Sequence, residues 1–221
     1  MPHTEVYVHG ARYAGYTCAE KINQVRAMLA KHGADGQIYT RLDCTAWLMD
    51  IRADDIAYTP LAVAWSAVLP DGAHLFIDTS RVKPEAMRCL KENGVTVHEY
   101  GEFEDFLKSY DREVRLLVDM TSTNGQTVEI LKGNASFSIR GGADIVTSLK
   151  GVKNSTEIEN IKKAHILDGC ALAAFKSAFE EKMAAGEKLT EWDVCVLLSE
   201  CRARLPENKG ESFATIAAYG A

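Results

Sequence analysis

The sequence lacks the segments that would place the chain in a membrane or on nucleic acid. No apolar run approaches the ~20 residues that a membrane-spanning helix needs. Acidic residues outnumber basic ones by 31 to 25, so the formal net charge is -6 and no basic surface is expected. The opening MPHTEVYVHGARYAG does not follow the basic-then-apolar order of a secretory signal. We therefore expect a cytoplasmic protein that binds neither membrane nor nucleic acid.

Short motifs that carry chemistry are also missing. None of HExxH, GxSxG, a Walker loop or GxGxxG occurs. The six cysteines form no CxxC pair, and the six histidines are not paired at metal-ligand spacing. We therefore expect reduced cysteines that fill the core. We assign no catalytic and no metal-binding residue to this chain, and its substrate-binding residues stay unknown.

Short strands and helices alternate over residues 1–150. Thr17 and Glu20 have the spacing of a capping box, Ile22, Val25 and Leu29 follow at helical spacing, and Gly33 suits the end of that helix. The expected elements that follow are a strand at GQIYT, a helix at LDCTAWLMDIR capped by Asp43, paired strands at LAVAWSAVL and AHLFID, a helix from Pro84 to Gly94, a strand at VTVHEY, a helix at FEDFLKSY and a strand at VRLLVDM. This order predicts an α/β fold, a mixed β-sheet flanked by helices.

Residues 151–221 have a different, helical character. Asn154 and Glu157 are placed to start a helix of more than twenty residues that Gly186 ends. TEWD, from Thr190 to Asp193, is a second capping arrangement that starts another helix. Two helices alone cannot bury both of their apolar stripes, so we expect this second domain to be incomplete. The final ESFATIAAYGA is expected to form a strand whose neighbours are missing.

Two stretches resemble a known family. TAWLMDIRADDIAYTPLAVAWSAVL is similar to the A-W-L-x-N-L-R-G-x-D segment of aminopeptidase P, the Xaa-Pro aminopeptidases. KNSTEIENIKKAHILDGCALAAF, with LTEWD after it, resembles the start of that family's catalytic "pita-bread" domain. The match runs from about Tyr13 to the end. Asp50, Ala53 and Ala214 depart from the usual Asn, Gly and Pro.

The resemblance implies a fragment of a metalloaminopeptidase that releases the residue preceding proline from peptides. Residues 1–150 would be a creatinase-like non-catalytic domain, and 151–221 the first part of the catalytic domain. The five ligands of two divalent ions, commonly manganese, would lie after Ala221, so the fragment would be inactive. The full-length parent would be a homodimer, because members of the family often pair through the catalytic domain. In three-domain members a further domain would precede it. Two alternatives stay open: a non-catalytic peptide- or histone-binding module like that of the FACT chaperone, and a related enzyme such as prolidase or creatinase.

Several residues invite a functional interpretation. His165 with Asp168 suggests an acid–base pair, but a helix-packing histidine bound to a neighbouring carboxylate or carbonyl is favoured. Arg52, beside Asp54 and Asp55, suggests a substrate clamp, but a structural ion pair is favoured. We expect three tryptophans to pack in the core or between domains: Trp47, Trp65 and Trp192. The acidic segment EFEDF, from Glu102 to Phe106, is expected to form a solvated face.

Overall fold

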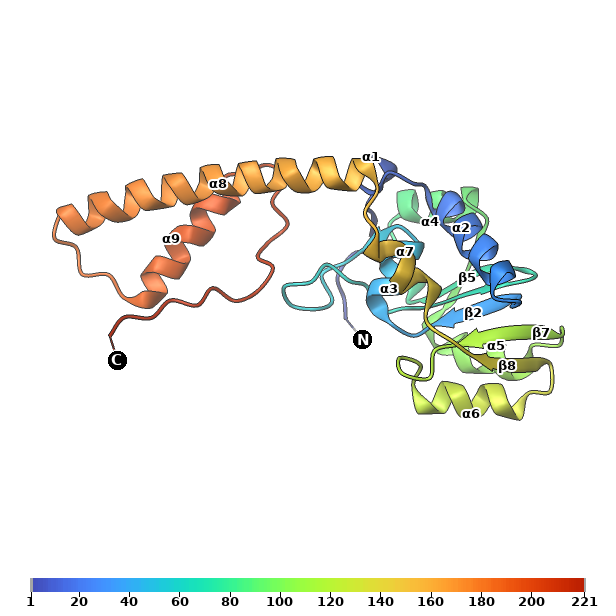
Figure 1. The fold of residues 1–221 in the computed structure, drawn as a ribbon. Coiled ribbons are helices and arrows are strands. Elements are labelled where there is room, and N and C mark those ends of the chain that lie inside the picture. The colour runs from blue at the N-terminus through green and yellow to red at the C-terminus, as the bar shows by residue number, and fades with distance from the viewer. Residues whose placement is uncertain (1, 221) are drawn as a thin grey trace. The chain divides into compact units, whose positions relative to one another are not determined.

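The computed structural model describes residues 2–220, which divide into two compact units (Figure 1). The first unit is the chain up to Ile56 together with Leu61–Asn154. The second unit is the short loop Ala57–Pro60 together with the residues from Ser155 onward. Each unit is described by itself below.

A six-stranded mixed sheet, with strand order β6-β5-β4-β2-β7-β8, forms the centre of the first unit. Its strands are β2 (Gly36–Tyr39), β4 (Trp65–Leu69), β5 (Gly72–Ile77), β6 (Val95–Glu99), β7 (Val114–Val118) and β8 (Phe137–Gly141). β4 is antiparallel to both β2 and β5, and the other neighbours are parallel. The predicted mixed sheet is confirmed, including the hairpin of β4 and β5.

A separate two-stranded ribbon was not expected from the sequence. It pairs β1 (Tyr7–Val8) antiparallel with β3 (Ile51–Arg52). Each strand has two residues, too few for an alternating pattern of apolar and polar side chains, so the sequence pattern does not predict them.

Helices cover both faces of the sheet. The helices of the first unit are α1 (Ala11–Ala14), α2 (Cys18–Lys31), α3 (Leu42–Leu48), α4 (Pro84–Glu92), α5 (Phe103–Ser109), α6 (Gly125–Gly133) and α7 (Ile145–Gly151), with the 3-10 turns η1 (Thr79–Arg81) and η2 (Tyr100–Glu102). One buried cluster joins α2, α3, α4 and α7 to the sheet, and a second cluster joins α5 and α6 to it. On β5, Leu75 and Ile77 enter the first cluster while Phe76 enters the second, as the alternation of a strand requires.

The start of α2 illustrates how local signals become structure. The Thr17 side chain accepts a hydrogen bond from the Glu20 amide, and the Glu20 carboxylate accepts one from the Thr17 amide, so the predicted capping box is confirmed. Gly33 follows the helix with φ 65°, a left-handed conformation that glycine adopts without a Cβ clash.

The predicted cap of α3 is wrong. The helix begins at Leu42 after Arg41, and no side chain caps it. Asp43 lies in its first turn, where Arg41 and Lys150 bind the carboxylate. Those two cations satisfy the carboxylate oxygens that a capping interaction would have used.

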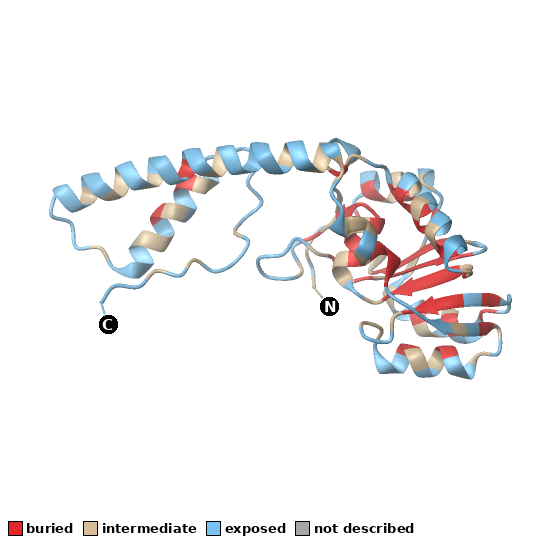
Figure 2. Cartoon of the chain, viewed as in Figure 1, coloured by how far each residue is buried: buried red, intermediate tan, exposed pale blue. Residues whose placement is uncertain are grey.

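The second unit contains two helices among its described residues, α8 (Ser155–Ala184) and α9 (Glu191–Ala203). The capping box predicted at Thr190 is confirmed, and the turn after α8 includes Gly186 with φ 78°. The expected strand in the tail is wrong: residues 211–220 form no strand. A strand needs a neighbouring backbone to pair with, and the described part of this unit supplies only helices. Figure 2 shows α8 and α9 mostly in the colours of exposed and intermediate residues.

Candidate functional site

The motif segment that includes Asp50 and Arg52 folds as α3, a tight turn and β3. Asp50 makes the turn with φ 57°, a left-handed conformation that is uncommon outside glycine and in which Asn and Asp are enriched. Its backbone carbonyl accepts a hydrogen bond from the His9 amide at 2.9 Å. The backbone at this position therefore favours a short polar side chain, which either Asn or Asp satisfies.

Asp50 is one half of a buried ion pair. Its Oδ1 lies 2.8 Å from Lys21 Nζ, with side-chain exposures of 5% and 1%. Lys21 Nζ also donates to the Trp47 carbonyl at 2.9 Å, and Asp50 Oδ2 accepts from the Gly10 amide at 2.9 Å. The pair thereby joins α2, the end of α3 and the segment after β1. Sequence reasoning missed it, although Lys21 on the apolar side of α2, between Cys18 and Ile22, was a visible signal.

Arg52 is held by carbonyl groups rather than by a carboxylate. Its Nη1 donates to the carbonyls of Ala46 at 2.9 Å and Ile51 at 2.8 Å. Burial lowers the pKa of the guanidinium, an effect that the charges of Asp50 and Tyr7 oppose. Arg52 forms no ion pair with any residue in 2–220. The predicted ion pair is therefore wrong, because the guanidinium binds backbone carbonyls and not a carboxylate. Arg52 instead satisfies a carbonyl at the end of α3.

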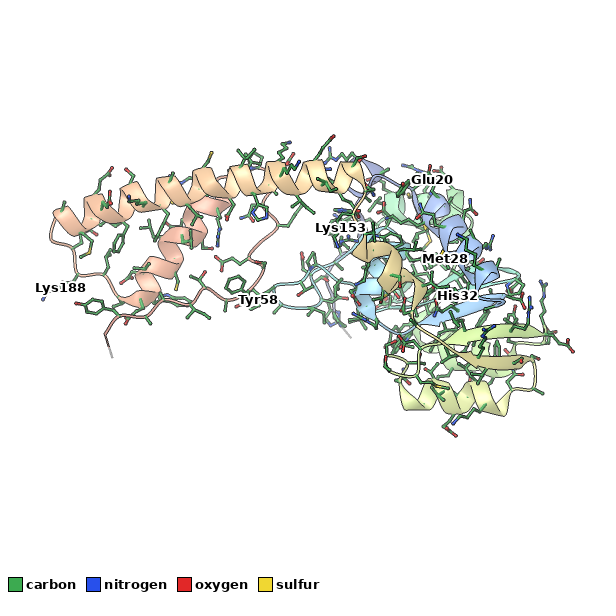
Figure 3. All side chains as sticks on the ribbon, viewed as in Figure 1. Glu20, Met28, His32, Tyr58, Lys153 and Lys188 are labelled. Carbon is green, nitrogen blue, oxygen red and sulfur yellow. The ribbon has the colours of Figure 1, made fainter. Side chains whose placement is uncertain are left out.

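The loop after β3 is anchored by Asp55 instead. Asp55 lies 2.7 Å from Arg81 Nη1, with side-chain exposures of 0% and 5%, and accepts from the Val63 amide at 2.7 Å and from the Thr4 hydroxyl. Burial opposes ionisation of Asp55, but the hydrogen bonds from Thr4, Arg81 and Val63 outweigh it and hold its pKa below the ordinary value. Tyr58, in the short loop Ala57–Pro60 that belongs to the second unit, has φ 63° and is 52% exposed (Figure 3).

His9 stays neutral at physiological pH. Burial is the main cause that lowers the pKa of its imidazole to about 4, and the positive charge of Arg52 acts in the same direction. Its ring stacks on Tyr13 with centroids 5.2 Å apart. A neutral imidazole beside two satisfied charges stabilises the packing here and offers no activated nucleophile.

The structure does not pair His165 with Asp168. Asp168 lies 2.7 Å from Arg202 Nε, an ion pair that joins α8 to α9 and raises the pKa of Arg202 through that hydrogen bond. His165 is exposed on α8, and no hydrogen bond of its ring occurs within residues 2–220. Both earlier interpretations, the acid–base pair and the packing histidine, are therefore wrong for the described structure.

The aromatic and acidic candidates have mixed outcomes. Trp65 stacks on Phe103 with centroids 5.2 Å apart, and Trp47 packs against the first cluster, so both pack as expected. Trp192 is 75% exposed, so its predicted packing is wrong within the described residues. In the Glu102–Phe106 segment, Glu104 and Asp105 bind the exposed Lys108, which agrees with a solvated face.

The cysteines are free, but not all of them fill the core. Cys18, Cys44 and Cys201 are buried, Cys89 and Cys195 are half-buried, and Cys170 is exposed. The core-filling prediction is therefore wrong for Cys170. Burial raises the pKa of both the Cys18 and the Cys44 thiol to about 12, which leaves neither thiol nucleophilic at neutral pH.

Residues 2–220 do not fit a metal centre. Within them, no three histidine, cysteine, aspartate or glutamate side chains come together in a group that could hold an ion. The buried carboxylates that the site does contain, Asp50 and Asp55, are bound by Lys21 and Arg81.

No described helix is both long and apolar enough to span a membrane.

Comparison with known proteins defines the class of protein. The family model described as the creatinase/prolidase N-terminal domain matches residues 1–157. The chain belongs to this family, in agreement with the mixed sheet and the resemblance noted in its sequence.

Within this family, the chain is similar to proteins named probable Xaa-Pro aminopeptidase P. The chain is 30% identical over 230 residues to a probable Xaa-Pro aminopeptidase P of Sordaria macrospora and 31% identical over 231 residues to one of Coprinopsis cinerea. Each alignment covers 99% of this chain and 37% of the relative. The chain thus spans little more than a third of the length of these curated relatives, and the resemblance to aminopeptidase P is confirmed.

Solved structures of similar fold include an X-prolyl aminopeptidase, in agreement with the relatives found by sequence. The X-prolyl aminopeptidase of Caenorhabditis elegans, described as a cytosolic enzyme with a di-nuclear active site, has a TM-score of 0.88 and 25% identity, and the match covers 97% of this chain and 35% of that one. A Xaa-Pro dipeptidase of Bacillus anthracis has a TM-score of 0.56 and 16% identity, over 85% of this chain and 49% of that one. The FACT subunit SPT16 N-terminal domain of Cicer arietinum has a TM-score of 0.51 and 11% identity, over 85% of this chain and 49% of that one. The last two show a shared fold alone.

Proposed function

We propose that this chain is the N-terminal part of a metal-dependent Xaa-Pro aminopeptidase that acts in the cytoplasm on peptides with proline in second position. The observation that carries the proposal is the likeness to probable Xaa-Pro aminopeptidases P over 99% of the chain. The di-nuclear X-prolyl aminopeptidase of C. elegans, with its TM-score of 0.88, supports the same activity and a pair of divalent ions, manganese in our proposal.

The two parts of the chain have different roles in this proposal. Residues 1–150 form a creatinase-like non-catalytic domain that limits access to the active site. The buried carboxylates of Asp50 and Asp55 are bound by Lys21 and Arg81, so neither is free to activate water. Such a domain acts by steric exclusion.

Residues 151–221 form the first part of the catalytic domain. Support comes from α8 and α9, which expose apolar side chains that a folded domain normally covers: Ile158, Ile161, Ile166, Leu172 and Val196. The metal ligands belong to segments that follow in the complete enzyme, which forms a homodimer through its catalytic domain. The chain itself is therefore inactive in this proposal.

The test compares this chain with the complete polypeptide encoded by its gene. Both are incubated with manganese and a tripeptide Xaa-Pro-Yaa, and release of the first residue is measured by mass spectrometry. We expect turnover by the complete polypeptide, abolished by a chelator, and none by the 221-residue chain. Chelator-sensitive turnover by the chain alone, or none by the complete polypeptide, contradicts the proposal.

Two alternatives are separated by the same assay. A prolidase cleaves the dipeptide Xaa-Pro in preference to the tripeptide, so the ratio of kcat/KM for the two substrates decides between these enzymes. A non-catalytic binding module of the FACT kind cleaves neither substrate with any metal. The sequence after Ala221 gives an independent check, since the enzyme requires two Asp, one His and two Glu there.

A further inference from the structure

Four titratable side chains lie in a row on the α5 side of the sheet. His74 on β5 and His98 on β6 are joined by a contact of 3.1 Å between Nδ1 of His74 and Nε2 of His98. At one end, Asp71 Oδ2 lies 3.5 Å from His74 Nε2. At the other end, Glu102 Oε2 lies 3.9 Å from His98 Nδ1. The row therefore runs carboxylate, imidazole, imidazole, carboxylate.

The two imidazoles are packed among aromatic rings. The His74 ring lies 4.8 Å from that of Phe106 on α5, and the His98 ring lies 4.7 Å from that of Phe76 on β5, centroid to centroid. His74 is 6% exposed, and 21% of the His98 side chain is exposed. The pair thus forms part of the surface that holds α5 against the two strands.

The hydrogen bond between the rings limits how many protons the pair can hold. One nitrogen must donate and the other accept, so the contact needs one N–H between them. Two neutral rings carry only two N–H groups, and one of these is used between the rings. One ring nitrogen without a proton therefore points its lone pair toward a carboxylate. Neither carboxylate contact is a hydrogen bond, and the buried His74 Nε2 has no hydrogen-bond partner among the described residues. A single added proton relieves the conflict, because an N–H can then point toward each carboxylate while the two rings keep their own hydrogen bond. A second added proton places two N–H groups face to face and breaks the contact between the rings.

Few other charged groups face the pair. Tyr110, which follows α5, donates to Asp71 Oδ1 at 2.8 Å, and burial together with Asp71 raises the pKa of that phenol. Asp111 and Arg112 shift the pKa of Tyr110 in opposite directions, upward and downward respectively. The neighbour of His74 on β4 is the uncharged Ala67. On α5, Glu104 and Asp105 bind Lys108.

We propose that His74 and His98 form an acid-sensitive latch that holds α5 against β5 and β6. The two rings share the first proton that they bind, and the contact between them persists, so α5 stays packed against β5 and β6. A second proton separates the rings and loosens this side of the first unit, while the centre of the sheet stays folded.

The direction of the pH dependence follows from burial. Desolvation lowers the pKa of both His74 and His98, an effect that Asp71 and Glu102 oppose respectively. The unfolded chain therefore binds more protons than the folded chain below the ordinary histidine pKa of about 6.5. The folded chain therefore loses stability relative to the unfolded chain as the pH falls from about 6.5 through the lowered values, while the contact between the rings persists until the second proton binds.

The first experiment follows the imidazole nitrogens of the unaltered chain by NMR during a pH titration. We expect the signals of His74 and His98 to move together in a shared first step below the ordinary pKa, with a separate second step at lower pH. Amide exchange in β5, β6 and α5 should accelerate in the second step, before exchange in β2 and β7. Two independent titrations at the ordinary pKa overturn the proposal.

The second experiment uses His98→Gln, which keeps an N–H able to donate to His74 but cannot titrate. The unfolding equilibrium constant changes about tenfold per pH unit for each proton of difference between the unfolded and folded states. We expect the slope of its logarithm against pH, below about pH 6.5, to fall by up to one unit in this variant. The exposed His32, labelled in Figure 3, supplies the matched control His32→Gln, which should leave the slope unchanged. An equal slope in His98→Gln and the unaltered chain overturns the proposal; if the variant does not fold, the NMR titration decides.

Discussion

The two compact units use similar helix signals and reach very different degrees of burial. α2 begins with a capping box at Thr17 and buries Ile22, Val25 and Leu29 against the sheet. α9 begins with a capping box at Thr190 and buries only Leu197 and Cys201. α8 is 30 residues long and buries Ala171 alone. Local signals are sufficient to start a helix, whereas burial of its apolar face requires a partner layer.

The largest expected effect lies in the first unit, where Lys21→Met leaves Asp50 buried without its cation. We expect a loss of about 3–5 kcal/mol in the free energy of unfolding, because an uncompensated buried carboxylate is strongly unfavourable. Urea denaturation monitored by tryptophan fluorescence measures it. A loss below about 1 kcal/mol would show that the pair is not buried in solution.

The double variant Lys21→Met with Asp50→Asn sharpens this prediction. It removes both charges and keeps at position 50 a side chain that tolerates the left-handed backbone. We expect it to recover most of the lost stability. Lys83→Met, which breaks an exposed pair with Glu5, serves as the control and should change little.

The next effect compares two leucines of the same size, one in each unit. Leu29→Ala removes a side chain that is 1% exposed and should cost about 2–5 kcal/mol of unfolding free energy. Leu172→Ala alters a side chain that is 42% exposed and should cost about 0.5 kcal/mol or less. Thermal and urea denaturation measure both. Equal costs would mean that α8 is covered in solution and would remove the contrast between the units.

A smaller effect compares the two capping boxes. Thr17→Ala and Thr190→Ala each remove a side chain that accepts a backbone hydrogen bond, at a typical cost of about 1 kcal/mol. In the first unit the cost should shift the midpoint of the whole cooperative transition. In the second unit it should appear as faster amide exchange limited to the first turn of α9. A shift of the main transition by Thr190→Ala would contradict this difference.

The smallest effect concerns the ion pair between α8 and α9. Asp168→Asn should lower the stability of their contact by about 1 kcal/mol or less, because the Asp168 and Arg202 side chains are 39% and 28% exposed and solvent screens them. Amide exchange in α9 at low and high salt measures it. The difference between Asp168→Asn and the unaltered chain should shrink at high salt, and a difference that salt does not alter would contradict a screened pair.

Interactions between residues close in the chain were largely predictable. The capping boxes at Thr17 and Thr190 are contained in four residues each, and the hairpin of β4 and β5 needs only two apolar runs and a turn. Interactions between distant residues were not. An acid–base pair of Asp168 with His165 was considered, but Asp168 binds Arg202. A clamp of Arg52 with Asp55 was considered, but Asp55 binds Arg81. Carboxylates accept from whichever donor the fold brings within reach, and sequence spacing does not report that distance.

The amino-acid sequence by itself determined the mixed α/β character of residues 1–150, the helical character that follows, and the family resemblance carried by the segment from Thr45 to Leu69. Only the tertiary structure decided that Lys21 neutralises Asp50, that carbonyl groups hold Arg52, and that His74 meets His98 across two strands. The reason is physical: helix starts and strand alternation depend on neighbours a few residues away, whereas a buried charge is stable only beside a partner that folding delivers from elsewhere in the chain.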